Sequence, residues 1–168
     1  MAFEIRRELW VPFPLPDVFD FFAKAENLER ITPPWLNFRI RTPLPIKMEP
    51  GTQILYSLRV HGLPIQWLTT IEKWNPPYEF VDVQTKGPYK LWHHTHRFTE
   101  SGGGTLIEDH VRYELPFGFL GRLVHRFQVA RDVETIFAYR AAHVEALIAD
   151  SISKKREKGV KGTQLSAF

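Results

Sequence analysis

The sequence contains no cysteine, which excludes disulfide bonds, thiolate metal sites and cysteine nucleophiles. It also lacks any apolar run near the roughly 20 residues that a membrane-spanning helix requires. The amino-terminal segment, residues 1–7, has no long apolar core, so we expect no signal peptide there. These absences predict a cytoplasmic protein.

Common nucleotide-binding and catalytic motifs are missing as well. No Gly-x-Gly-x-x-Gly, phosphate-loop or Gly-x-Ser-x-Gly pattern occurs. The run Gly102-Gly103-Gly104 indicates a hairpin turn, because no helical pattern follows it. Basic and aromatic residues do not interleave in the strip that single-stranded nucleic acid requires, and Arg39 with Arg41 is too little. We therefore expect no nucleic-acid partner and no cofactor.

The net charge of +3 is modest, and part of it is concentrated near the end of the chain. We expect residues 154–168 to form a basic, flexible tail that could make weak contact with an anionic membrane surface. Residues 1–153 are long enough for a single domain with a sizeable core. We expect the protein to be a monomer or a homodimer. The clustered basic residues are Lys154, Lys155, Arg156, Lys158 and Lys161.

Hydrophobic periodicity predicts the order of the first elements. Residues 3–11 alternate as a strand with one buried face, and residues 17–23 and 27–31 follow as two short helices. From Trp35 to Leu115 the apolar residues recur at every second position between turn residues. This pattern is typical of six strands in an antiparallel meander.

The chain then changes to helical periodicity. Residues 122–158 contain no proline or glycine, and their apolar residues recur at helical spacing. They form one stripe, whose positions include Val133, Phe137, Arg140 and Val144. We therefore predict one long amphipathic helix, whose stripe must be buried against the sheet.

One predicted strand has an unusual composition. Residues 87–98 lie between turn residues, and successive side chains of a strand point to opposite faces. Trp92, His94, His96 and Phe98 therefore share one face. Apolar walls with a few placed polar groups suit a ligand pocket better than a plain core.

Four segments also carry a resemblance to a known superfamily. The chain is similar to SRPBCC proteins, which include START lipid-transfer domains, birch-pollen-allergen-type proteins and bacterial polyketide cyclase/dehydratase-like proteins. The resemblance covers about residues 3–150 and is greatest for the bacterial ligand-binding branch. The segments are PLPDVFDFF at 14–22, WNPPYEF at 74–80, GPYKLWHHTHRF at 87–98 and DHVRYELP at 109–116.

The resemblance implies an α+β helix-grip fold. A curved antiparallel sheet of about seven strands would wrap around the long C-terminal helix, with two short helices after the first strand. A deep cavity would lie between sheet and helix, with Glu134 near its helical wall. The predicted ligand-binding residues are Tyr56, Leu58, Trp67, Thr69, Phe80, Asp82, Gln84, Trp92, His94, His96, Asp109, Tyr113, Phe127 and Arg131.

The polar residues of this set leave several functions open. His94 and His96 could hold a metal with Asp109 or Asp82, but one His-x-His pair is weak support, so we predict no metal. The same histidines could work with Asp109 as acid and base in a polyketide cyclase, dehydratase or aromatase. A third interpretation is that the polar residues satisfy one another across strands and leave little cavity, the set being His94, His96, Asp82, Gln84 and Asp109. We favour a fourth interpretation, binding of a hydrophobic small molecule or lipid without chemistry.

Overall fold

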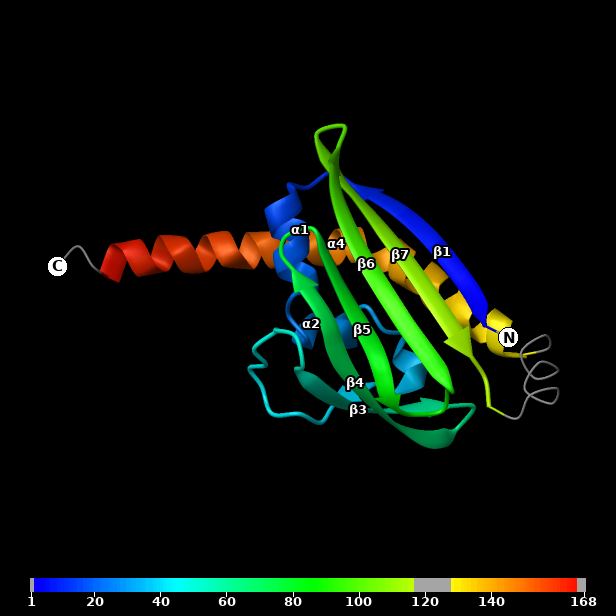
Figure 1. Cartoon of the computed structure of the whole chain (residues 1–168). Helices are drawn as coiled ribbons and strands as arrows, with labels where there is room; N and C mark the ends of the chain where they lie inside the picture. Colours follow the sequence, from blue (N-terminus) through cyan, green and yellow to red (C-terminus); the bar gives the residue numbers. More distant parts are fainter. Residues whose placement is uncertain (1, 117–127, 166–168) are drawn as a thin grey trace.

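A computed structural model describes residues 2–116 and 128–165 of the chain, and of residues 158–165 only the backbone (Figure 1). The first strand, β1, spans Phe3–Val11 and is followed by the helices α1, Leu15–Phe22, and α2, Glu26–Arg30. Pro16 at the first turn of α1 suits a helix start, since its missing N–H would have no partner there. A short 3-10 helix, η1 at Pro34–Leu36, completes the segment.

The remaining strands form one antiparallel sheet in the order β1-β7-β6-β5-β4-β3-β2. The predicted meander of six strands is confirmed. β1 forms the seventh strand at the edge of the sheet, where it pairs with β7 so that Phe3 lies opposite Tyr113. The two helices after β1 carry the chain to the opposite edge of the sheet. The strands of the meander are β2 (Arg39–Ile40), β3 (Gln53–Val60), β4 (Leu63–Asn75), β5 (Glu79–Lys86), β6 (Leu91–Ser101) and β7 (Gly104–Glu114).

The glycine run forms the hairpin turn between β6 and β7. Gly102 and Gly103 have φ angles of 56° and 80°, in the left-handed region that glycine adopts readily. At Gly104 an added Cβ would lie 2.3 Å from the carbonyl oxygen of Val11. The third glycine therefore lets β1 approach the end of this hairpin.

The long helix α4 spans Ala130–Leu165 and passes behind the sheet, with its C-terminal part extending beyond it (Figure 1). It buries Val133, Phe137, Val144 and Ile148, all spaced for one helix face. No helix of the described residues is long and apolar enough to cross a membrane.

The expected limits of this helix differ from the described ones. Residues 122–127, which we expected to be helical, lie outside the described residues. The backbone is helical through Leu165, so α4 continues into the basic segment. The flexibility of residues 154–168 stays a prediction.

Three groups of buried side chains hold these layers together. The largest joins α1, α4 and the sheet, with the Phe19 ring 5.4 Å from Phe98 and 6.2 Å from Phe80. A second packs Val133 and Phe137 of α4 against β7, and a third surrounds Tyr56 on β3. The largest group fixes α4 across the sheet near residues 144–148.

We expect Ile148→Ala to lower the free energy of unfolding by about 3 kcal/mol, because it opens a void in the largest core group. Leu63→Ala is the control, since that side chain is 68% exposed, and it should change stability by less than about 0.5 kcal/mol. Urea unfolding followed by circular dichroism measures both. Equal losses in the two variants would contradict the packing of α4 on this core.

Candidate functional site

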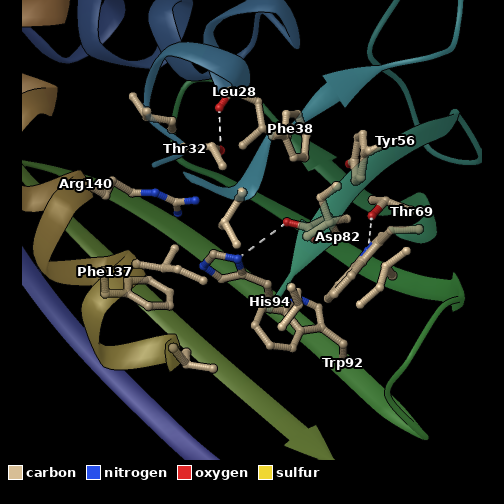
Figure 2. A pocket seen from close by; sticks show the side chains of 18 of the residues that line it. Leu28, Thr32, Phe38, Tyr56, Thr69, Asp82, Trp92, His94, Phe137 and Arg140 are labelled. Atoms are coloured by element: carbon tan, nitrogen blue, oxygen red, sulfur yellow. Dashed lines mark hydrogen bonds and ion pairs between the residues drawn. The ribbon is translucent and has the colours of Figure 1, made fainter. Parts of the chain in front are cut away.

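A cavity of about 600 Å³ lies between the inner face of the sheet, the short helices and the first turns of α4. It borders all three core groups, through Phe80, Phe137 and Tyr56 among others. Figure 2 shows its side chains converging from the sheet, from α4 and from the segment around Leu28 and Thr32. The lining is mostly apolar, with a few polar groups.

Most of the predicted residues lie on this cavity. Because the strands alternate as predicted, inward positions of β3, β4, β5 and β6 meet on one surface. Phe127 lies outside the described residues, and Gln84, Asp109 and Tyr113 do not line the cavity. The predicted residues that do line it are Tyr56, Leu58, Trp67, Thr69, Phe80, Asp82, Trp92, His94, His96 and Arg131.

The other predicted residues have structural partners instead. The Gln84 side chain donates to the backbone oxygen of Tyr89 at 2.6 Å and accepts from its N–H, so it fixes the connection between β5 and β6. Tyr113 is 2% exposed and packs against Trp92 in the second core group. Glu134 pairs with Arg7 beside a separate hollow of about 190 Å³.

Asp109 lies behind the two cavity histidines and forms a four-residue cluster with them and Asp82. His94 Nε2 and Asp109 Oδ1 form a hydrogen bond of 2.8 Å, and His96 Nε2 and Asp82 Oδ2 form another of 2.8 Å. His96 Nδ1 is 3.0 Å from Asp109 Oδ1, but without the alignment of a hydrogen bond. The two imidazole centroids are 3.7 Å apart, and Phe80 stacks on His96 at 4.1 Å.

This cluster gives the histidines different acidities. Burial lowers the pKa of His94, and the neighbouring His96 lowers it further. Burial opposes charge on His96 too, but contacts with Asp109 and Asp82 outweigh it and raise the pKa of His96 above 6.5. Burial alone would raise the pKa of Asp109, yet the hydrogen bond with His94 and the close contact with His96 hold that pKa well below 3.8. His96 is therefore the more readily protonated of the two imidazoles.

Two further polar groups reach the cavity from the sheet. Burial, followed by the charge of Asp82, raises the pKa of Tyr56 above its ordinary value of 10, so its hydroxyl remains neutral and can donate. The Trp67 indole N–H donates to Thr69 Oγ1 at 3.0 Å. The polar edge of Trp67 is thus satisfied within the protein.

Asp82, His94 and His96 also carry the atom types of a metal site. One ligand atom from each lies within 4.8 Å of the others, and Asp109 contacts both imidazoles from behind, as outer carboxylates do in metal sites. In the present geometry, however, Asp82 and His96 are at hydrogen-bond distance and satisfy each other. The prediction of no metal stays untested.

The interpretation that these polar residues satisfy one another and leave little cavity is half right. The histidines and aspartates do satisfy one another across strands, as the hydrogen bonds show. They nevertheless leave a cavity of about 600 Å³ beside them, so mutual satisfaction does not fill the space.

The rim of the cavity combines the β3–β4 turn with the start of α4. His61 in that turn has a φ angle of 51° and lies 2.8 Å from Asp132, from its Nε2 to Oδ2. Arg131 and Trp35 are exposed cavity residues, Trp35 at 55%. These exposed lining residues indicate where the cavity meets solvent.

Sequence reasoning placed Arg140 on the stripe of the long helix but did not predict that it lines the cavity from α4. It lies three residues after Phe137 and four before Val144, on the buried stripe of the helix. A cation in such a stripe is a signal that could have been found. Reasoning about the strands alone also omitted the lining of the connecting segments, which includes Asn27, Leu28, Thr32, Phe38 and Met48.

Comparisons with known proteins agree with the fold. The family model described as "Polyketide cyclase / dehydrase and lipid transport" matches residues 11–138. No curated protein sequence matches the chain significantly.

Solved structures give further similarities. The protein TTHA0849 from Thermus thermophilus is 18% identical, with a TM-score of 0.61 over 90% of this chain and 94% of that one. Protein Ms6760 from Mycobacterium smegmatis is 15% identical, with a TM-score of 0.64 over 88% of this chain and 92% of that one. A norcoclaurine synthase point mutant from Thalictrum flavum, in complex with a transition-state analogue, is 13% identical, with 0.65 over 89% and 96%. The architecture is the predicted helix-grip fold, and the chain belongs to the polyketide cyclase/dehydrase and lipid transport family.

Proposed function

We propose that the protein binds a hydrophobic or amphipathic small molecule in the cavity between its sheet and α4. The main observation in support is a cavity of about 600 Å³ with mostly apolar walls and a few convergent polar side chains. Such a volume and lining are typical of small-molecule sites, which range over about 300–1,000 Å³. The family description includes lipid transport, which supports a ligand of this class.

Aromatic rings supply much of the apolar contact surface. Trp67 and Trp92 meet edge to face at 5.2 Å, and Tyr89 lies 4.8 Å from Trp92. Because these rings support one another, each holds a fixed orientation before any ligand enters. A preformed wall loses little side-chain entropy on binding, which favours affinity.

The polar residues give the cavity a direction. Asp82, His94 and His96 lie together on β5 and β6, away from the exposed rim at Trp35 and Arg131. An amphipathic ligand would place its polar end on this group and its apolar part along the aromatic wall. Transport or sequestration of such a molecule would need no further chemistry.

A second candidate is a cyclase, dehydratase or aromatase acting on a polyketide-like chain. It is favoured by the unequal histidines, since His96 with its raised pKa can donate a proton while neutral His94 can accept one. Asp109 contacts both imidazoles and holds them in place. The cavity would select a folded conformer of the chain, which lowers the entropic part of the barrier.

Loss of an aromatic wall should weaken binding. Trp67→Ala is expected to lower the affinity for the neutral fluorescent probe N-phenyl-1-naphthylamine at least about tenfold, because burying an aromatic side chain is worth about 1.5–3 kcal/mol. The matched control is Trp10→Ala, whose ring lies outside the cavity and is 46% exposed. A fluorescence titration that gives both variants the wild-type affinity, or no binding to the wild type, would refute the binding site.

The histidine cluster predicts a distinct titration. In proton–nitrogen NMR spectra, His96 should titrate above pH 6.5 and His94 below it. Asp82→Asn removes the charge that faces His96 and should lower its pKa, whereas Asp20→Asn on α1 should leave both curves unchanged. Since the folded-state pKa of His96 is raised, its contacts stabilise the fold fully below pH 6.5, and this contribution is lost as the pH rises through that pKa. A lower pKa for His96 than for His94 would contradict the geometry.

Turnover separates the two candidates. If the cavity catalyses cyclisation or dehydration of a poly-β-ketone thioester, His96→Gln should lower kcat about 100-fold, the usual scale of a lost acid–base group. N-phenyl-1-naphthylamine affinity serves as the control and should remain within about twofold of the wild type. Full activity in His96→Gln would remove this residue from the mechanism, and an inactive wild type would leave the binding function alone.

A further inference from the structure

Arg140 is a polar group of the cavity that stands apart from the histidine cluster. Its side chain extends from α4 toward the interior of the cavity, on the side of Phe137 and Thr32 (Figure 2). The guanidinium carbon lies 5.3 Å from the centroid of the Phe137 ring. This ring supports one face of the planar group and leaves its edge free to donate hydrogen bonds.

The described residues leave this guanidinium incompletely satisfied. Its Nε is buried and has no hydrogen-bond partner among them, and no described carboxylate lies within 4.0 Å of its nitrogens. A buried donor without an acceptor costs free energy, so an acceptor supplied from the cavity would stabilise the protein. Arg131, another arginine on the cavity, is exposed and has no such deficit.

The carboxylates of Asp82 and Asp109 already form hydrogen bonds with histidines. Asp82 Oδ2 hydrogen-bonds His96 at 2.8 Å, and Asp109 Oδ1 hydrogen-bonds His94 at 2.8 Å. Burial alone would raise the pKa of Asp82, but the two histidines and, after them, the charge of Arg140 lower it, so the charge of Arg140 acts on the cavity interior. It does so without closing an ion pair with a described residue.

We propose that the cavity is selective for ligands with a carboxylate group, which Arg140 binds while the aromatic wall holds an apolar or aromatic body. A guanidinium presents paired N–H donors that match the two oxygens of a carboxylate, and such charge-assisted pairs are stronger than neutral hydrogen bonds. Because Arg140 lines the cavity and has no described carboxylate partner, its N–H donors are available to such a ligand. This inference rests on the proposed binding function and narrows its substrate class to amphipathic acids.

The test compares two ligands that share one apolar body, 2-naphthoate and its neutral counterpart 2-naphthylmethanol. Each displaces N-phenyl-1-naphthylamine from the wild-type protein at about pH 7.5. We expect 2-naphthoate to bind about tenfold more tightly, because only it forms the charge-assisted pair. Equal affinities in the wild type would overturn the carboxylate preference while leaving the binding function intact, and failure of all three molecules to bind would overturn both.

Variants assign the preference to the residue. Arg140→Gln should abolish it while changing the affinity for 2-naphthylmethanol less than about twofold, and Arg140→Lys should keep part of it. Arg131→Gln is the matched control, because it removes an exposed guanidinium from the same cavity and should keep the full preference. A preference that survives in folded Arg140→Gln, or disappears in Arg131→Gln, would contradict the proposal. The wild-type ligand comparison decides the question even if Arg140→Gln does not fold.

Discussion

The register of β5, β6 and β7 is the constraint on which the site depends. Asp82 lies opposite His94, and His96 lies opposite Asp109. The two 2.8 Å hydrogen bonds nevertheless run diagonally, from His96 to Asp82 and from His94 to Asp109. Each imidazole therefore connects two neighbouring strands, and each carboxylate has a partner. A slip of one residue in either pairing would turn the side chains of one strand to the opposite face and separate a carboxylate from its histidine. A buried charge left without its partner costs several kcal/mol.

Packing explains why space remains beside this cluster. Near residues 144–148, α4 lies on the phenylalanines of α1, β5 and β6, and nearer its start it contacts β7 through Val133 and Phe137. The core group around Tyr56 on β3 contains Leu28 of α2 but no described residue of α4. Rings such as Trp67 contact Trp92 and Tyr89 instead of α4, and the cavity lies between them and the helix.

The sequence was informative where one residue type repeats at a fixed spacing. Alternation predicted the meander and placed Trp92, His94 and His96 on one face, and helical spacing predicted the long helix. The resemblance to SRPBCC proteins predicted that this face points inward, where the cavity lies. The sequence was less informative where the direction of a side chain depends on its hydrogen-bond partners. Gln84 has the alternation of a cavity residue, yet it turns to the Tyr89 backbone, a contact that only the folded β5–β6 connection creates. The lining from the short helices could not be predicted, because no periodic rule relates those segments to the sheet.

Arg140 shows how a site can use a residue that breaks a pattern. On an amphipathic stripe a charged side chain is unfavourable unless it is paired, and the described part of the chain gives this one an aromatic face but no carboxylate. The four-residue cluster on β5, β6 and β7 differs, because each of its two carboxylates forms a hydrogen bond with a histidine of the same cluster. The carboxylates of the cluster are thus paired, whereas the guanidinium of Arg140 has no carboxylate partner among the described residues; His96 Nδ1 also lacks a hydrogen-bond partner there. A ligand gains most from Arg140, because its hydrogen bonds there replace no ion pair that the described residues already make.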